Sequence, residues 1–164
     1  MMQFIVHEDP VGRAVTNYIA RADLARFGLD GQVEQLWLTV VNDGSYQVAC
    51  IPFSTYGLAL GDTVLLHNDY IINVVGTSRH RVLRLLFTPD LPLGELQRTA
   101  EAIRTEITAA GLLSEWNGDR FVAVDVPPNA APSQLFAAME TAVSAGHAFW
   151  EWADAMPFSR PGDA

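Results

Sequence analysis

Hydrophobic and polar residues alternate with a period of two through much of the first half of the chain. Leu36, Leu38 and Val40 alternate with Trp37 and Thr39, and short turns rich in glycine and polar residues separate the apolar runs. Four or five strands in close succession predict a curled antiparallel sheet or small β-barrel over residues 34–88. The expected strands are 36–42, 45–51, a segment after Asp62, 70–75 and 81–87.

From residue 92 the apolar positions recur at helical spacing. Leu93, Leu96, Ala100 and Ile103 fall on one stripe of a helix that ends at Gly111. A strand hairpin follows over 112–127, then a helix over 133–146, and the aromatic segment 148–152 can add a last strand. This order predicts a ferredoxin-like split βαβ half over residues 81–152.

The N-terminal segment has the signals of a further helix. Asp9 followed by Pro10 is a typical helix start, and apolar residues recur at helical spacing up to Gly28. We therefore expect an extra helix over 10–27 and a loop up to residue 33. The predicted fold class is α+β, with a single domain over 1–154 and a flexible tail over 155–164.

The charged residues limit the classes of partner that the protein is expected to bind. The net charge is -9, and all ten basic residues among the 164 are arginine. The absence of lysine excludes a Schiff-base lysine and a phosphate-loop lysine. An acidic surface disfavours nucleic acid and attracts a basic protein or peptide, although net acidity also serves solubility alone.

Targeting and cofactor signals are missing from the sequence. No apolar run is long enough to span a bilayer, so we expect a cytoplasmic protein without membrane contact. The single cysteine, Cys50, lies in an apolar run, which predicts a buried, inert thiol. The four histidines share no metal-ligand spacing, so no metal site, cofactor or catalytic residue is predicted.

A cluster of arginine and histidine is the first candidate binding site. Arginine binds carboxylate or phosphate through two hydrogen bonds, and histidine exchanges a proton near neutral pH. The alternative is a solvated turn between two strands, with side chains that point to opposite faces. The candidate residues are Ser78, Arg79, His80, Arg81 and Arg84.

Two acidic residues and a tryptophan complete the candidates. Asp125 lies in the apolar run FVAVDVP, and Glu115, beside Trp116, is expected across the hairpin from it. Burial would raise either pKa and prepare the group for acid or base chemistry. In the alternative interpretation, Asp125 caps the backbone or pairs with an arginine, and Trp116 closes a core.

Four stretches together resemble a bacterial family of unknown function. They are the Leu-Trp pair at 36–37, IPFSTYGLALGDTV, VVGTSRHRVLRLLF and GLLSEWNGDRFVAVDVP. The third stretch is similar to a family pattern of serine, glycine, histidine and, four residues later, arginine. Ser78, His80 and Arg84 match it, whereas Arg79 stands where glycine is expected. The resemblance implies no reaction, cofactor or catalytic residue.

These observations favour a non-enzymatic, acidic protein-binding or peptide-binding protein, such as an immunity-type inhibitor or an accessory protein. The alternative is a small-molecule site or a small enzyme, with the ligand between the β-rich half and the split βαβ half. A third hypothesis is a homodimer that assembles through the aromatic residues Trp150 and Trp152.

Overall fold

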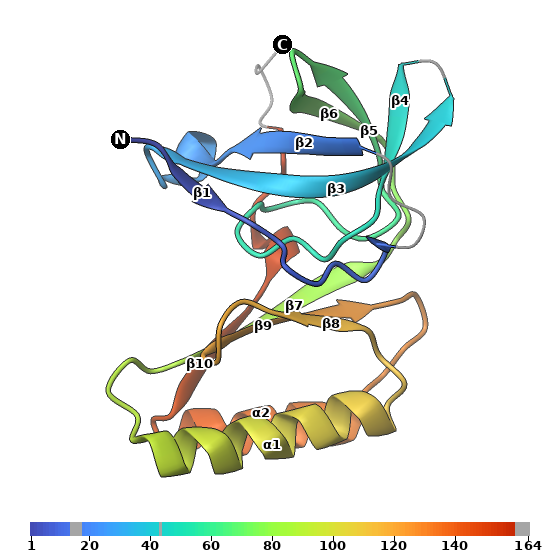
Figure 1. Cartoon of the computed structure of the whole chain (residues 1–164). Coiled ribbons are helices and arrows are strands. Elements are labelled where there is room, and N and C mark those ends of the chain that lie inside the picture. Colours follow the sequence, from blue (N-terminus) through green and yellow to red (C-terminus); the bar gives the residue numbers. More distant parts are fainter. Residues whose placement is uncertain (14–17, 43, 160–164) are drawn as a thin grey trace.

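Two sheets lie one above the other, and two helices cover the far face of the second sheet (Figure 1). This computed structural model describes residues 1–13, 18–42 and 44–159. The prediction of a mixed fold, with a curled sheet in the first half and two helices in the second, is confirmed.

The first sheet, here called the ring sheet, curls because one strand has partners at both of its ends. β3 spans 11 residues, pairs antiparallel with β2 along its first half and pairs with β4 near its end. The order β1-β3-β2-β6-β5-β4 is therefore closed by β3 and β4. Its strands are β1 (Gln3–Ile5), β2 (Tyr18–Asp23), β3 (Gln32–Asn42), β4 (Ser45–Val48), β5 (Thr63–His67) and β6 (Tyr70–Gly76).

The second sheet, here called the backed sheet, has the antiparallel order β10-β7-β9-β8. Alternation along β7 turns Leu83, Leu85 and Phe87 toward the helices, where they share one core with Leu96 and Ile103. Neither helix in the described part of the chain is long and apolar enough to span a membrane. The elements are β7 (Arg81–Phe87), α1 (Leu93–Ala109), β8 (Ser114–Trp116), β9 (Phe121–Val126), α2 (Ser133–Ser144) and β10 (Ala148–Trp152).

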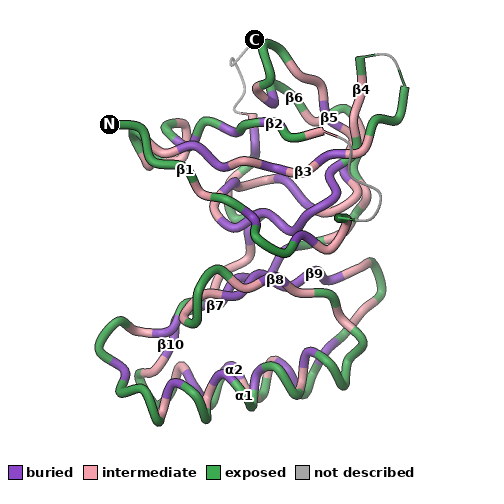
Figure 2. Tube along the Cα trace, in the orientation of Figure 1, coloured by how far each residue is buried: buried purple, intermediate pink, exposed green. Residues whose placement is uncertain are grey.

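The other face of the backed sheet packs against loops of the ring sheet, and we call this contact region the junction. Ile51 and Phe53 from the segment after β4 share a small core with Val82 of β7 and Ala123 of β9. Figure 2 shows buried residues, in purple, on the segments of both sheets that meet at the junction. The chain crosses the junction between β6 and β7, at residues 77–80, so the predicted arginine–histidine cluster lies there.

The predicted helix over 10–27 is wrong where the segment is described. Residues 18–23 form strand β2, and residues 24–27 form a short 3₁₀ helix, η2 (Leu24–Phe27). Ala20 and Ala22 are buried while their neighbours are more exposed, which is the period of a strand paired with β3. Tertiary pairing thus overrides the local helix signals, and residues 14–17 lie outside the described chain.

The segment after β10 returns to the ring sheet. A 3₁₀ turn, η3 (Ala153–Ala155), follows β10, and Phe158 is buried in the core of the ring sheet. Gly57 has φ 68°, and a Cβ there would lie 2.1 Å from the backbone nitrogen of Phe158. Within the predicted tail, Phe158 is therefore anchored in this core, and the backbone at Phe158 lies so close to position 57 that only glycine fits there.

Candidate functional site

A buried histidine lies between two buried carboxylates at the junction. His7 Nδ1 is 2.7 Å from Glu115 Oε1, and His7 Nε2 is 2.9 Å from Glu34 Oε1. The three side chains come from the segment after β1, from β8 and from β3. Their residues are no more than 4% exposed. We call them the sealed cluster.

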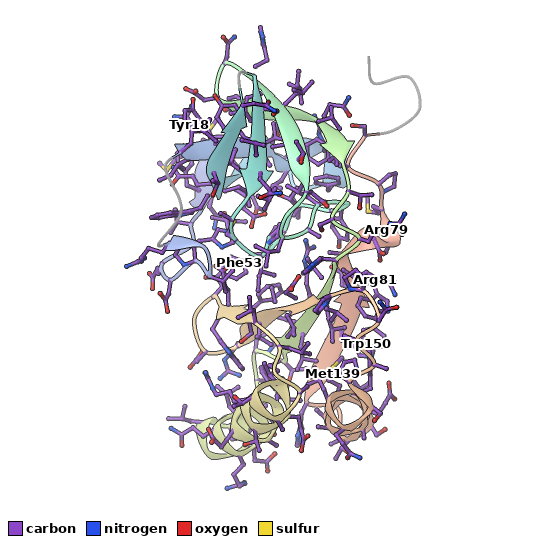
Figure 3. All side chains as sticks on the ribbon, turned by 90° about the vertical axis from the view of Figure 1, so that its right-hand side faces the viewer. Tyr18, Phe53, Arg79, Arg81, Met139 and Trp150 are labelled. Atoms are coloured by element: carbon purple, nitrogen blue, oxygen red, sulfur yellow. The ribbon has the colours of Figure 1, made fainter. Side chains whose placement is uncertain are left out.

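Backbone N–H groups and a hydroxyl also donate to the two oxygens of Glu34. The N–H groups of Phe53 and Thr55 donate to it at N···O distances of 2.5 and 2.7 Å, and the Thr55 hydroxyl donates at 2.7 Å. The Phe53 ring stacks on the His7 ring with a centroid distance of 4.2 Å, and Phe53 lies at the junction in Figure 3. The cluster is thus bonded on all sides and shielded from water.

Both nitrogens of His7 face carboxylate oxygens, which requires the doubly protonated imidazolium. Burial alone would lower the pKa of His7, but the hydrogen bonds and charges of Glu115 and Glu34 outweigh burial and raise it to about 9. Burial would raise the pKa of Glu34, but His7, Thr55 and the Phe53 N–H lower it to about 2. The sealed cluster therefore joins the N-terminal segment to both sheets as a charged cross-link.

A second histidine–carboxylate pair lies at the edge of the junction, and we call it the open pair. His80 Nδ1 is 2.9 Å from both oxygens of Asp125 in β9. Asp125 is only 3% exposed, whereas 28% of the His80 side chain is exposed. Burial raises the pKa of Asp125, and the hydrogen bond and charge of His80 oppose that shift.

A hydrogen-bonded turn holds His80 in this position. The Asp62 carboxylate accepts from the Ser78 N–H at 2.8 Å and from the Ser78 hydroxyl at 3.0 Å. The same Ser78 oxygen accepts from the His80 N–H at 3.1 Å. Because Asp125 takes Nδ1, Nε2 is the free ring nitrogen, and it has no hydrogen-bond partner among the described residues.

Two cavities open beside the open pair. The smaller has a volume of about 220 Å³, and the larger about 380 Å³. Arg79 and Arg81 line both, and Figure 3 shows them close together at the level of the junction. The smaller cavity is also lined by His80, Asp62 and Asp154, and the larger by Phe136, Trp152 and prolines 127, 128 and 132.

The two arginines differ in how far their charge is satisfied. Arg81 makes two hydrogen bonds to Asp154, at 2.8 and 3.0 Å, and its guanidinium lies 3.7 Å from the centroid of the Trp152 ring. Arg79 forms no ion pair with any described residue, and its φ is 64°. This left-handed backbone is the conformation that glycine adopts in a tight turn. The turn is therefore present although arginine stands where glycine is expected, and the arginine backbone is strained.

The structure brings five of the predicted binding residues together and separates three. Ser78, Arg79, His80, Arg81 and Asp125 surround the cavities or support the turn between them. Glu115 lies opposite Ala123 and not Asp125, so the expected cross-hairpin contact with Asp125 is wrong. Glu115 belongs instead to the sealed cluster.

Arg84 and Trp116 occupy other environments. Arg84 is 3% exposed, donates to the Thr55 carbonyl oxygen and lies 3.5 Å from Glu151. Burial lowers its pKa. Trp116 stacks near Phe87 at a centroid distance of 6.3 Å and packs against the core under the helices. Arg84 therefore links β7 to a loop of the ring sheet and to β10, whereas Trp116 closes a core, as the structural alternative predicts.

Sequence reasoning missed the sealed cluster, and it also missed that Asp62 and Asp154 lie at the same cavity. His7 and Glu115 are 108 positions apart, so no spacing rule links them. In the described chain, no group of three or more His, Cys, Asp or Glu side chains is arranged to hold a metal ion. Cys50 is buried, and burial raises its pKa, which fits an unreactive thiol.

Comparisons place this ring-and-sheet architecture among known proteins. The family described as Domain of unknown function (DUF4265) matches residues 34–152, so the chain belongs to that family and the resemblance is confirmed. None of the curated proteins matches. The crystal structure of a hypothetical protein from Neisseria gonorrhoeae has a similar fold, with a TM-score of 0.61 and 16% identity over 82% of this chain and 94% of that one.

Proposed function

We propose that the chain binds a small organic anion in the groove between the two sheets, with His80 as the proton donor or acceptor toward that ligand. One observation carries the proposal: His80 is fixed through Nδ1 by a buried carboxylate, while the residue itself lines a cavity together with two arginines. An oriented imidazole with one free nitrogen is the usual arrangement of a group that exchanges a proton with a ligand.

The position of the cavities supports the same proposal. Binding sites favour concave surfaces at the boundary between structural units, with a few converging polar groups. The smaller cavity combines His80, Asp62 and Arg79 with the apolar side chains of Leu58 and Val82.

Ligand-induced changes in the histidine NMR signals test this proposal. Small carboxylates and inorganic phosphate are titrated into the protein, and the ring signals of His80 are expected to shift with saturation. His147 is a matched control, since its side chain is also 28% exposed and lies 3.1 Å from Glu95. Signals of His80 that stay unchanged with every anion, or that change no more than those of His147, overturn the proposal.

A second proposal concerns the surface as a whole. The net charge of -9, with no lysine, favours association with a basic protein or peptide, as in an immunity-type inhibitor. Association with an arginine-rich peptide should then slow steeply as salt is added. A rate that does not depend on salt contradicts this second function and leaves the first untouched.

Two finer structural interpretations belong with these proposals. We interpret the order β10-β7-β9-β8, with its two helices on one face, as a ferredoxin-like split βαβ unit. Trp150 and Trp152 pack on Phe136 of α2, at centroid distances of 5.7 and 5.8 Å. Self-association through these two residues would have to disturb that packing. Phe149 is 66% exposed and is therefore a better candidate for a homodimer contact.

A further inference from the structure

The two cavities at the junction adjoin each other and differ in chemistry. Arg79 and Arg81 contribute to both, so the cavities meet at these two side chains. Charged and polar side chains gather in the smaller cavity, whereas proline, phenylalanine and tryptophan gather in the larger one. A ligand that occupied both would need a polar end and an apolar end.

The charges around the smaller cavity limit the charge of that polar end. Asp154 neutralises Arg81, and the Asp62 carboxylate accepts hydrogen bonds from the Ala59 N–H and from the N–H and hydroxyl of Ser78. Arg79 is then the one cation on the described walls without an ion-pair partner. One free guanidinium in a chain of net charge -9 suits a single negative charge and disfavours a polyphosphate.

We infer that the ligand is a monocarboxylate with an aromatic or aliphatic group attached, an inference that rests on the proposed function. In the smaller cavity the carboxylate accepts hydrogen bonds from the Arg79 guanidinium and, when the His80 ring carries a proton on both nitrogens, from its Nε2–H. The apolar group lies in the larger cavity, against Trp152, Phe136 and the prolines that follow β9.

The backbone of Arg79 supports its role as the residue that selects charge. Its φ of 64° lies in the left-handed region, which glycine adopts without strain. Strained residues of this kind cluster at ligand sites, where the side chain has a use that offsets the strain. The guanidinium at this position borders both cavities, which is where the two ends of the ligand would join.

Matched ligands and variants test the inference by calorimetric titration. Phenylacetate is expected to bind at least about tenfold more tightly than acetate, because its ring buries apolar surface. It should also bind at least about tenfold more tightly than phenylacetamide, which lacks the charge. Replacing Arg79→Gln should weaken phenylacetate binding about tenfold or more, whereas Arg98→Gln, a change of an exposed arginine on α1, should leave it unchanged.

The possible results distinguish a failure of the monocarboxylate inference from a failure of the proposed anion site. If acetate and phosphate perturb His80 as strongly as phenylacetate does, or if Arg79→Gln binds phenylacetate normally, the inference is overturned while the anion site stands. If no anion perturbs His80, the proposed function itself fails. Arg79→Gly gives a further check, because it removes the charge and the backbone strain together and should still lose the binding.

Discussion

The sealed cluster and the open pair use the same chemistry in opposite ways. In each, a histidine nitrogen lies within 2.9 Å of a carboxylate oxygen. His7 has carboxylates on both nitrogens and is buried, whereas His80 has one carboxylate and reaches a cavity. Residue type therefore does not distinguish a fully enclosed histidine from one that faces a cavity. Burial and the number of satisfied nitrogens do.

The largest expected effect is the loss of the sealed cluster. His7→Ala leaves two buried carboxylates without their counter-charge, which should lower the free energy of unfolding by about 3–5 kcal/mol. Urea denaturation measures this change. The control is His147→Ala, which breaks a partly exposed ion pair with Glu95 and should cost less than about 1 kcal/mol. Similar losses in the two variants would contradict a structural role for His7.

The next effect is a fall in stability at alkaline pH. The pKa of His7 rises from 6.5 in the unfolded chain to about 9 in the fold, so its contribution is complete below pH 6.5 and is lost as the pH rises through 9. The difference corresponds to about 3 kcal/mol. Urea midpoints measured from pH 6 to pH 9 should show this decline.

His7→Gln should remove most of that decline, which separates His7 from other groups. Cys50 also has a raised pKa, but an acid with an ordinary value of 9.0 affects stability only above that pH. A decline of unchanged size in the His7→Gln variant would assign the pH dependence to groups outside the sealed cluster.

The open pair should matter much less for stability. Asp125→Asn keeps an oxygen that accepts from His80 Nδ1 and should cost about 1 kcal/mol, since His80 is partly hydrated. Glu34→Gln is the matched change in the sealed cluster and should cost several times as much, because it leaves the His7 charge poorly compensated. Equal costs in thermal unfolding would erase the proposed difference between the two sites.

The smallest effect is a gain in stability at the strained turn. Arg79→Gly should raise the free energy of unfolding by up to about 1 kcal/mol, because the relief of left-handed strain exceeds the added freedom of the unfolded chain. Asn129→Gly is the control, since Asn129 also has a positive φ, of 69°, but asparagine tolerates it. A loss of stability in Arg79→Gly would show that the guanidinium supports the fold.

Local patterns predicted the second half of the chain better than the first. The helices from 93 and 133 and the strands around them follow from apolar spacing that their own packing uses. In the segment 18–23, spacing compatible with a helix gave way to pairing with β3, which the sequence of that segment does not specify.

The candidate site divides in the same way. Residues 78–81 are neighbours in sequence, so their cluster was visible, and burial of Asp125 followed from its apolar run. His7, Glu34 and Glu115 meet only through the junction of two sheets, and Asp154 reaches Arg81 across 73 positions. Such contacts depend on how the two sheets pack, which spacing along the chain does not describe.

Histidine side-chain NMR at neutral pH, with and without phenylacetate, tests the difference between the two histidines most directly. His7 should show protons on both ring nitrogens and signals that do not respond to the ligand, because both nitrogens already face carboxylates. The His80 ring signals should shift as phenylacetate saturates the cavity. A His7 ring with an unprotonated nitrogen, or a ligand response at His7 and none at His80, would contradict the account.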